Sequence, residues 1–284
     1  MIDDHPRARH QAGLTQASVV WHAPAEFGIP RYMAIFQETI PGRVGPVRSA
    51  REYFVAWAGE WRSVYARVGG SPDARKLLRD QGDGQLVFDG DEYRFKSTYF
   101  RSSSRVAPHN LYTTGEQLRA LAERLGAGDG PLQPVWKFGP DRSAEKRPIG
   151  GHIHISYPAN AVRYDYDTEA NRYMRFVSGG QPQIDTGRDK RVGPKNVVVM
   201  VVPFRPARDG TNYQRLDALY VGSGTAWIAT NGRTIKGTWS KASLAEPTLF
   251  FDDAGNPATF TAGQTFIQVV PTGTAVRFTP GRGR

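Results

Sequence analysis

Apolar and polar residues alternate along much of this chain, and the alternation predicts strands. The longest apolar run, residues 197–204, is of strand length and rich in valine, so it predicts a buried central strand. Residues 152–157, 162–166 and 173–177 alternate with period two, which is typical of strands with one buried face. Asn231 and Gly232 separate two further runs of this kind and predict a tight hairpin.

Three segments of the first half have helical spacing instead. Each begins with a serine or threonine whose side chain can accept a hydrogen bond from a backbone N–H of the first turn. These predicted N-caps are Ser49, Ser71 and Thr114. Glu52 and Gln117 lie three residues beyond the first and the last of them, which completes the capping-box pattern.

Together these elements predict an α+β fold with two domains. We expect a mixed α/β N-terminal domain over residues 1–155 and a smaller, mainly antiparallel β domain over residues 156–284. Residues 126–150 are rich in glycine, proline and charged residues, and they mark the change from one pattern to the other.

Composition narrows the classes of function. The chain carries 37 Lys and Arg against 27 Asp and Glu, a net charge of +10, but the basic residues are scattered. No nucleic-acid-binding motif accompanies them, so we predict no specific nucleic-acid partner and favour an anionic envelope polymer or lipid surface. Cysteine is absent, which excludes disulfides, zinc–thiolate sites and thiol nucleophiles.

The chain has no run of about 18 apolar residues that could cross a bilayer, and its first residues are polar. Met1 and Ile2, followed at once by two aspartates, look like the end of a strand. We therefore expect that a segment upstream of Met1, with any targeting signal, is missing.

Polar residues that could carry chemistry form clusters in the first half. Arg48 and Arg51 flank a predicted helix start, where two guanidiniums and free backbone amides can clamp a phosphate or carboxylate. The alternative is that both arginines are solvated or paired with acidic neighbours. The candidate acidic partners are Glu26, Glu38 and Glu52.

Histidines supply a second kind of candidate. His109 lies in a loop beside Pro108, where it can act as an acid, a base or a ligand, or satisfy backbone groups in a purely structural way. His152 and His154 share one strand face, but no third ligand follows from the spacing. We predict no metal and no cofactor.

Several motifs resemble the YerB-like family of bacterial lipoproteins, whose function is uncharacterised. The resemblance runs in order through residues 1–9, 11–14, 23–36, 45–54, 69–72, 107–113, 196–199, 222–224 and 237–239. It implies a longer N-terminal and a smaller C-terminal part, with a lipoprotein signal and linker upstream that would provide membrane anchoring. Gln183 stands where the family pattern has histidine.

The resemblance also focuses the candidate site, because ten polar residues fall within matching motifs. Among them Asp3, Glu26 and His109 are the candidate catalytic residues. The candidate ligand-binding residues are His5, Arg31, Arg48, Ser49, Arg51, Ser71 and Asn110. We expect these positions to converge at one edge of the α/β half, where open α/β sheets bind ligands.

Three hypotheses about function follow. The first is an extracytoplasmic cell-envelope protein that binds an anionic or glycan-type ligand through an Arg/Glu/His cluster. The second is an envelope hydrolase or phosphotransferase with Glu26 or His109 as acid or base. The third is a structural partner in an envelope complex. The first is favoured because no nucleophile–base pair and no complete metal set can be identified in the sequence.

Overall fold

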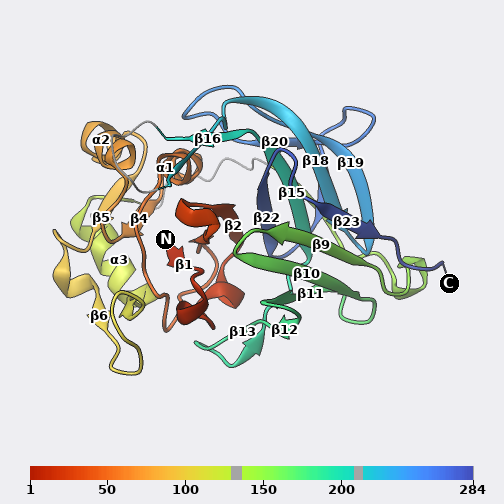
Figure 1. The fold of residues 1–284 in the computed structure, drawn as a ribbon, viewed down its shortest axis with the longest axis horizontal. Coiled ribbons are helices and arrows are strands. Elements are labelled where there is room, and N and C mark those ends of the chain that lie inside the picture. Colours follow the sequence, from red (N-terminus) through yellow and green to blue (C-terminus); the bar gives the residue numbers. More distant parts are fainter. Residues whose placement is uncertain (129–135, 208–213, 284) are drawn as a thin grey trace.

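The computed structural model describes residues 1–128, 136–207 and 214–283. Strand accounts for 42% of the structure and helix for 16%, so the chain is more β-rich than the predicted α+β fold. In the first half, β1, β2 and β3 join a sheet that is otherwise built from the second half (Figure 1). Part of the predicted boundary region, residues 129–135, lies outside the described residues.

The main sheet has eight strands in the order β1-β3-β2-β22-β15-β18-β19-β20. Their bounds are Ile2–Asp3 (β1), Val19–Pro24 (β2), Pro30–Ile35 (β3), Asn196–Val202 (β15), Gly222–Thr230 (β18), Arg233–Lys241 (β19), Leu249–Phe251 (β20) and Thr265–Pro271 (β22). β22 runs parallel to β2 on one side and to β15 on the other. Figure 1 shows the red N-terminal strands beside dark-blue β22. The domain boundary at residue 155 stays a prediction, since one sheet unites strands from both sides of it.

β15 confirms the expected buried central strand. Because side chains alternate across a strand, its apolar residues divide between the two faces of the sheet. Val198 and Met200 belong to the core on one face, and Val197 and Val199 belong to the core on the other. An uninterrupted apolar run is what a strand covered on both faces requires.

A second, five-stranded sheet covers one face of the main sheet, in the order β12-β11-β10-β9-β23 (Figure 1). Its strands are His152–Tyr157 (β9), Asn160–Asp167 (β10), Arg172–Val177 (β11), Gln181–Pro182 (β12) and Val276–Thr279 (β23). The predicted hairpin at Asn231 and Gly232 is also confirmed, because Thr230 pairs with Arg233 across it.

Helices lie on the side of the N-terminal strands, away from the long β18–β19 hairpin (Figure 1). The described residues form three α-helices: Glu52–Gly59 (α1), Pro72–Gln81 (α2) and Gly115–Arg124 (α3). Ser71 caps α2 and accepts a hydrogen bond from the amide of Ala74, and Thr114 and Gln117 form the expected capping box of α3.

The predicted cap of α1 is wrong. Ser49 does not cap this helix; its N-cap residue is Arg51, whose side chain makes no capping bond. The reason is not local, because Ala50 forms a parallel bridge with Gly70 and keeps the backbone extended through Arg51. A capping box needs Glu52 three residues inside the helix, but the helix begins only at Glu52, after the extended Arg51.

Short strand pairs and 3₁₀ turns complete the structure. The paired strands are Val64–Arg67 (β4) with Phe88–Asp91 (β5), Phe100–Arg101 (β6) with Leu111–Tyr112 (β7), Lys137–Gly139 (β8) with Thr259–Thr261 (β21), Ile184–Asp185 (β13) with Lys190–Arg191 (β14), and Phe204–Pro206 (β16) with Leu216–Ala218 (β17). The 3₁₀ turns are Pro6–Ala8, Leu14–Gln16, Glu26–Gly28, Lys96–Thr98 and Ala144–Lys146. Among the helices of the described residues, none combines the length and apolar character that crossing a membrane requires.

Candidate functional site

Seven of the ten predicted site residues lie together in the structure, and we call them the charged cluster. They are Asp3, His5, Glu26, Arg31, Arg48, Arg51 and His109. Strand pairing positions the centre, because Asp3 of β1 lies directly opposite Arg31 of β3. Glu26 enters from the 3₁₀ turn before β3, and His109 enters from the loop before β7. Residues far apart in the sequence therefore meet at the edge of the main sheet.

Asp3 is completely buried and is the hub of the charged cluster. Its Oδ1 accepts from the backbone amide of His5 at 3.0 Å and from Nη1 of Arg31 at 3.2 Å. Its Oδ2 accepts from Nδ1 of His109 at 2.7 Å and lies 3.1 Å from Nε of Arg48. A carboxylate only accepts, so His109 donates its Nδ1–H to Asp3 and, when neutral, keeps Nε2 as an acceptor.

Glu26 lies at the other end of the charged cluster and pairs with two arginines. One of its oxygens accepts from Nη2 of Arg31 at 2.5 Å, and the second accepts from Nε of Arg51 at 3.0 Å and also from Nη2 of Arg51. Burial raises the pKa of the Glu26 carboxyl, but the Arg31 and Arg51 guanidiniums outweigh burial and lower it to about 2. Glu26 therefore stays ionised at neutral pH and has no proton to give as a general acid.

Arg48 and the two histidines form the accessible part of the charged cluster. The Arg48 side chain is 21% exposed, and its guanidinium donates no hydrogen bond to any residue that the structure describes. His5 stacks on His109 with ring centroids 4.5 Å apart, and its Nδ1 accepts from the backbone amide of Arg7. Burial, followed by the neighbouring His109, lowers the pKa of His5. This part of the cluster offers unused donors to a ligand.

The other three predicted residues make different contacts. Ser71 caps α2, and its hydroxyl lies 3.3 Å from the amide of Ala74. Asn110 accepts from Arg101 at 3.0 Å and donates to the backbone of Ser102. Ser49 forms no hydrogen bond with the residues that the structure describes. None of the three contacts a residue of the charged cluster by a described hydrogen bond or ion pair.

Sequence reasoning missed a second polar network directly behind the charged cluster. Asp4 and His22 are both completely buried, and Nε2 of His22 lies 3.0 Å from Oδ2 of Asp4. The same carboxylate accepts from Nε of Arg9 at 2.9 Å and from the amide of Asn160 at 2.7 Å. Nδ1 of His22 lies 2.9 Å from Oε1 of Gln268. In the sequence, only the two consecutive aspartates at positions 3 and 4 point to this network.

The charges of this second network are fixed by their surroundings. Burial raises the pKa of Asp4, but the hydrogen bond from His22 and the charges of Arg9 and Arg175 bring it below its usual range. Burial lowers the pKa of His22 despite the opposing effect of Asp4. These directions favour an ionised Asp4 carboxylate and an uncharged His22, which has a single N–H to share between Asp4 and Gln268.

Gln183 occupies the interior near this network. Its amide donates to Oε1 of Gln11 at 2.9 Å and to the Tyr32 hydroxyl at 3.2 Å, and its oxygen accepts from Arg175. Arg175 is completely buried and also donates to the hydroxyls of Tyr32 and Tyr164, each at 2.9 Å. Gln183 thus belongs to a packed polar core.

Metal ligation finds no support among the residues that the structure describes. No three or more histidine, aspartate, glutamate or cysteine side chains gather there in an arrangement that could hold an ion. His152 and His154 lie on β9 in the second sheet, where Nε2 of His152 is 3.0 Å from the Thr279 hydroxyl.

Comparison with known proteins places the chain in a family. The family model described as "Protein of unknown function (DUF3048) N-terminal domain" matches residues 1–128, and the corresponding C-terminal domain model matches residues 153–267. The chain belongs to the DUF3048 family. All seven residues of the charged cluster lie within the N-terminal match.

A relative from Bacillus subtilis (strain 168), named "Putative lipoprotein YerB", is 30% identical to this DUF3048 protein over 294 residues. The match covers 100% of this chain and 83% of the relative. The crystal structure of the YerB protein from Bacillus subtilis superimposes with a TM-score of 0.84 at 28% identity. It covers 97% of this chain and 91% of that chain, so the similarity to the YerB-like family is confirmed over nearly the whole length.

Proposed function

We propose that this DUF3048 protein acts in the bacterial cell envelope, outside the cytoplasm, and binds an anionic or glycan-type ligand at the charged cluster. The name of the Bacillus relative, "Putative lipoprotein YerB", supports the location. The net charge of +10 supports an anionic partner, because a positive field attracts anions.

The observation that carries the proposal is the state of Arg48. Asp3 holds this guanidinium at 3.1 Å, yet the guanidinium donates to no described residue. Burial lowers the pKa of Arg48, although the Asp3 charge opposes this effect, so the group is already partly desolvated. A cation that is oriented, partly dehydrated and unused as a donor is prepared to bind a carboxylate or phosphate.

Further basic groups lie at the loop that follows His5. Arg7 is exposed and follows His5 in the chain. Arg105 donates to the backbone oxygens of Arg7 and His10, which holds a second guanidinium beside the same loop. Glu26 contributes no free negative charge, because Arg31 and Arg51 neutralise it. An approaching anion therefore meets an excess of positive charge.

A second candidate function is catalysis at the same place, favoured by the 2.7 Å contact between Asp3 and His109. A carboxylate that accepts from one ring nitrogen of a histidine orients the other nitrogen for proton transfer. In this hypothesis His109 is the acid or base of a hydrolase or phosphotransferase. Glu26 is disfavoured in that role by its pKa of about 2.

Calorimetric titration tests the binding proposal. The probes are inorganic pyrophosphate and a disaccharide–peptide fragment of peptidoglycan, and at least one of them should bind the wild-type chain saturably. Arg48→Gln should weaken that binding about tenfold or more, because a charge-assisted hydrogen bond is lost. Measurement of released phosphate in the same samples tests the catalytic alternative.

The matched control is Arg233→Gln, which removes one exposed positive charge from β19, far along the chain from the charged cluster. It should leave the affinity within about twofold, since a single distant surface charge is screened by salt. Equal weakening by the two substitutions, or no binding of either probe to the wild-type chain, would contradict the proposal.

A further inference from the structure

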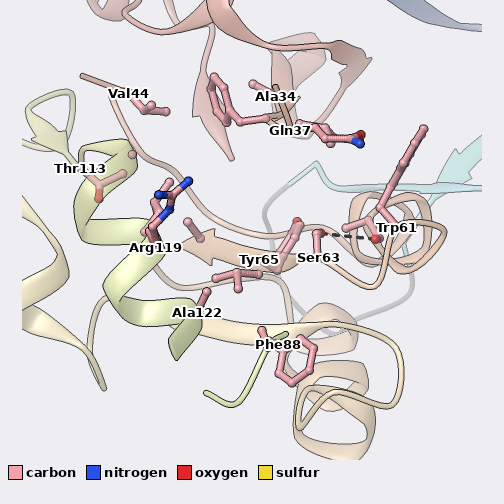
Figure 2. Close-up of a pocket in the computed structure, with 18 of the residues that line it drawn as sticks. Ala34, Gln37, Val44, Trp61, Ser63, Tyr65, Phe88, Thr113, Arg119 and Ala122 are labelled. Atoms are coloured by element: carbon pink, nitrogen blue, oxygen red, sulfur yellow. Dashed lines mark hydrogen bonds between the residues drawn. The ribbon is translucent and has the colours of Figure 1, made fainter. Parts of the chain in front are cut away.

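A large cavity lies in the N-terminal part of the chain, apart from the charged cluster. Its volume is about 940 Å³, at the upper end of the range of small-molecule sites. α3, β4 and the β1–β3 edge of the main sheet surround it (Figure 2). None of the seven residues of the charged cluster lines it.

The lining of this apolar cavity is predominantly hydrocarbon. Strands and helices contribute aliphatic and aromatic side chains from all sides, among them Ile2, Met33, Ile35, Val64, Phe88 and Ala122. At the rim, Ile40 remains 46% exposed. No aspartate or glutamate lines the cavity, whereas two arginines, Arg62 and Arg119, do. The charge of the lining is therefore positive without an internal counter-charge.

The side chains of the two arginines differ in their contacts. Arg62 donates from Nε to the Gly84 carbonyl oxygen at 2.6 Å, and its guanidinium lies 5.8 Å from the Phe88 ring centroid. Arg119 of α3 is exposed, and its side chain has no hydrogen bond or ion pair with any residue that the structure describes. In Figure 2 Arg119 lies at the end of the cavity that Thr113 and Val44 also line, and Trp61 and Gln37 lie at the other end.

We propose that the apolar cavity binds the hydrocarbon chain of a single-chain amphiphile and that Arg119 pairs with its anionic head group. Burial of a hydrocarbon chain removes both its surface and the apolar lining from water, which is the dominant favourable term for such a ligand. A hydrocarbon chain matches more of this lining than a glycan does, because aliphatic and aromatic side chains outnumber the polar ones there. A cationic head would be repelled by both arginines.

The test uses the full chain and a long-chain fatty acid with a fluorescent polyene tail. Its fluorescence should rise on binding and saturate at one equivalent. Ala122→Trp places an indole in the cavity and should weaken binding about tenfold or more, since the lost apolar burial is worth more than about 1.4 kcal/mol. Ala120→Trp, on the exposed face of the same helix, should leave binding unchanged.

A second pair of variants tests the contact between Arg119 and the anionic head group. Arg119→Gln should weaken binding of the fatty acid and leave binding of its methyl ester unchanged, whereas Arg124→Gln on the same helix should affect neither. A long-chain alkyl phosphate should displace the fatty acid, and inorganic phosphate should not, because the hydrocarbon chain supplies the affinity. The proposal is overturned if the fatty acid does not bind saturably, or if both tryptophan variants weaken its binding equally. It is also overturned if inorganic phosphate, or an apolar peptide, displaces the fatty acid.

Discussion

Pairing with Asp3 and Glu26 determines which arginines of the charged cluster keep hydrogen-bond donors for a ligand. Glu26 accepts hydrogen bonds from Arg31 and Arg51 through both of its oxygens, so both guanidiniums are paired inside the protein. Arg48 shares only an ion pair with Asp3 and keeps its donors. The sequence alone left both possibilities open for Arg48 and Arg51, and the structure separates the two residues.

Glu26→Gln should lower the free energy of unfolding at pH 7 by about 3 kcal/mol, because the pKa of Glu26 falls from 4.5 to about 2 in the folded chain. A lowered pKa means that the stabilisation is fully present above pH 4.5 and is lost as the pH falls through about 2. Urea denaturation between pH 7 and pH 2 measures it: the variant should lack this part of the acid dependence. Glu123→Gln, an exposed site on α3, is the control. A loss below about 1 kcal/mol, as for a surface pair, would show that the two arginines do not hold Glu26 as described.

Local chemistry determines where α2 and α3 begin, and so these helix starts could be predicted from sequence. The caps at Ser71 and Thr114 need only neighbours within three residues. The start of α1 could not be predicted in this way, because the bridge between Ala50 and Gly70 joins segments that no local pattern connects. Elements whose ends depend on non-local pairing are the ones that the sequence misplaces.

Ser71→Ala should destabilise the protein by about 1 kcal/mol, because the amide of Ala74 loses its hydrogen-bond acceptor. Ser71→Asp should retain most of the stability, since aspartate also caps helices and favours the helix N-terminus electrostatically. Thermal unfolding of the three proteins measures the difference. An aspartate variant as unstable as the alanine variant would indicate that capping is not what Ser71 contributes.

At the scale of the whole molecule, the sequence predicted most strands but not how they assemble. Alternation identifies β9, β10 and β11 correctly, and the uninterrupted apolar run identifies β15. The parallel pairing of β2 with β22, however, joins residues about 250 positions apart. The same long-range closure brings His22 next to Gln268 and places Gln183 beside Gln11. The members of the charged cluster could be predicted because they lie in the motifs that resemble the YerB-like family. The second network and the apolar cavity form only when distant segments pack together.

The most direct test of the charged cluster as an anion site is a crystal structure of the protein with pyrophosphate. The account predicts density for the anion within hydrogen-bond distance of the Arg48 guanidinium and beside His109, with Glu26 still paired to Arg31 and Arg51. Density for pyrophosphate at another place only, or none at a saturating concentration, would contradict the account.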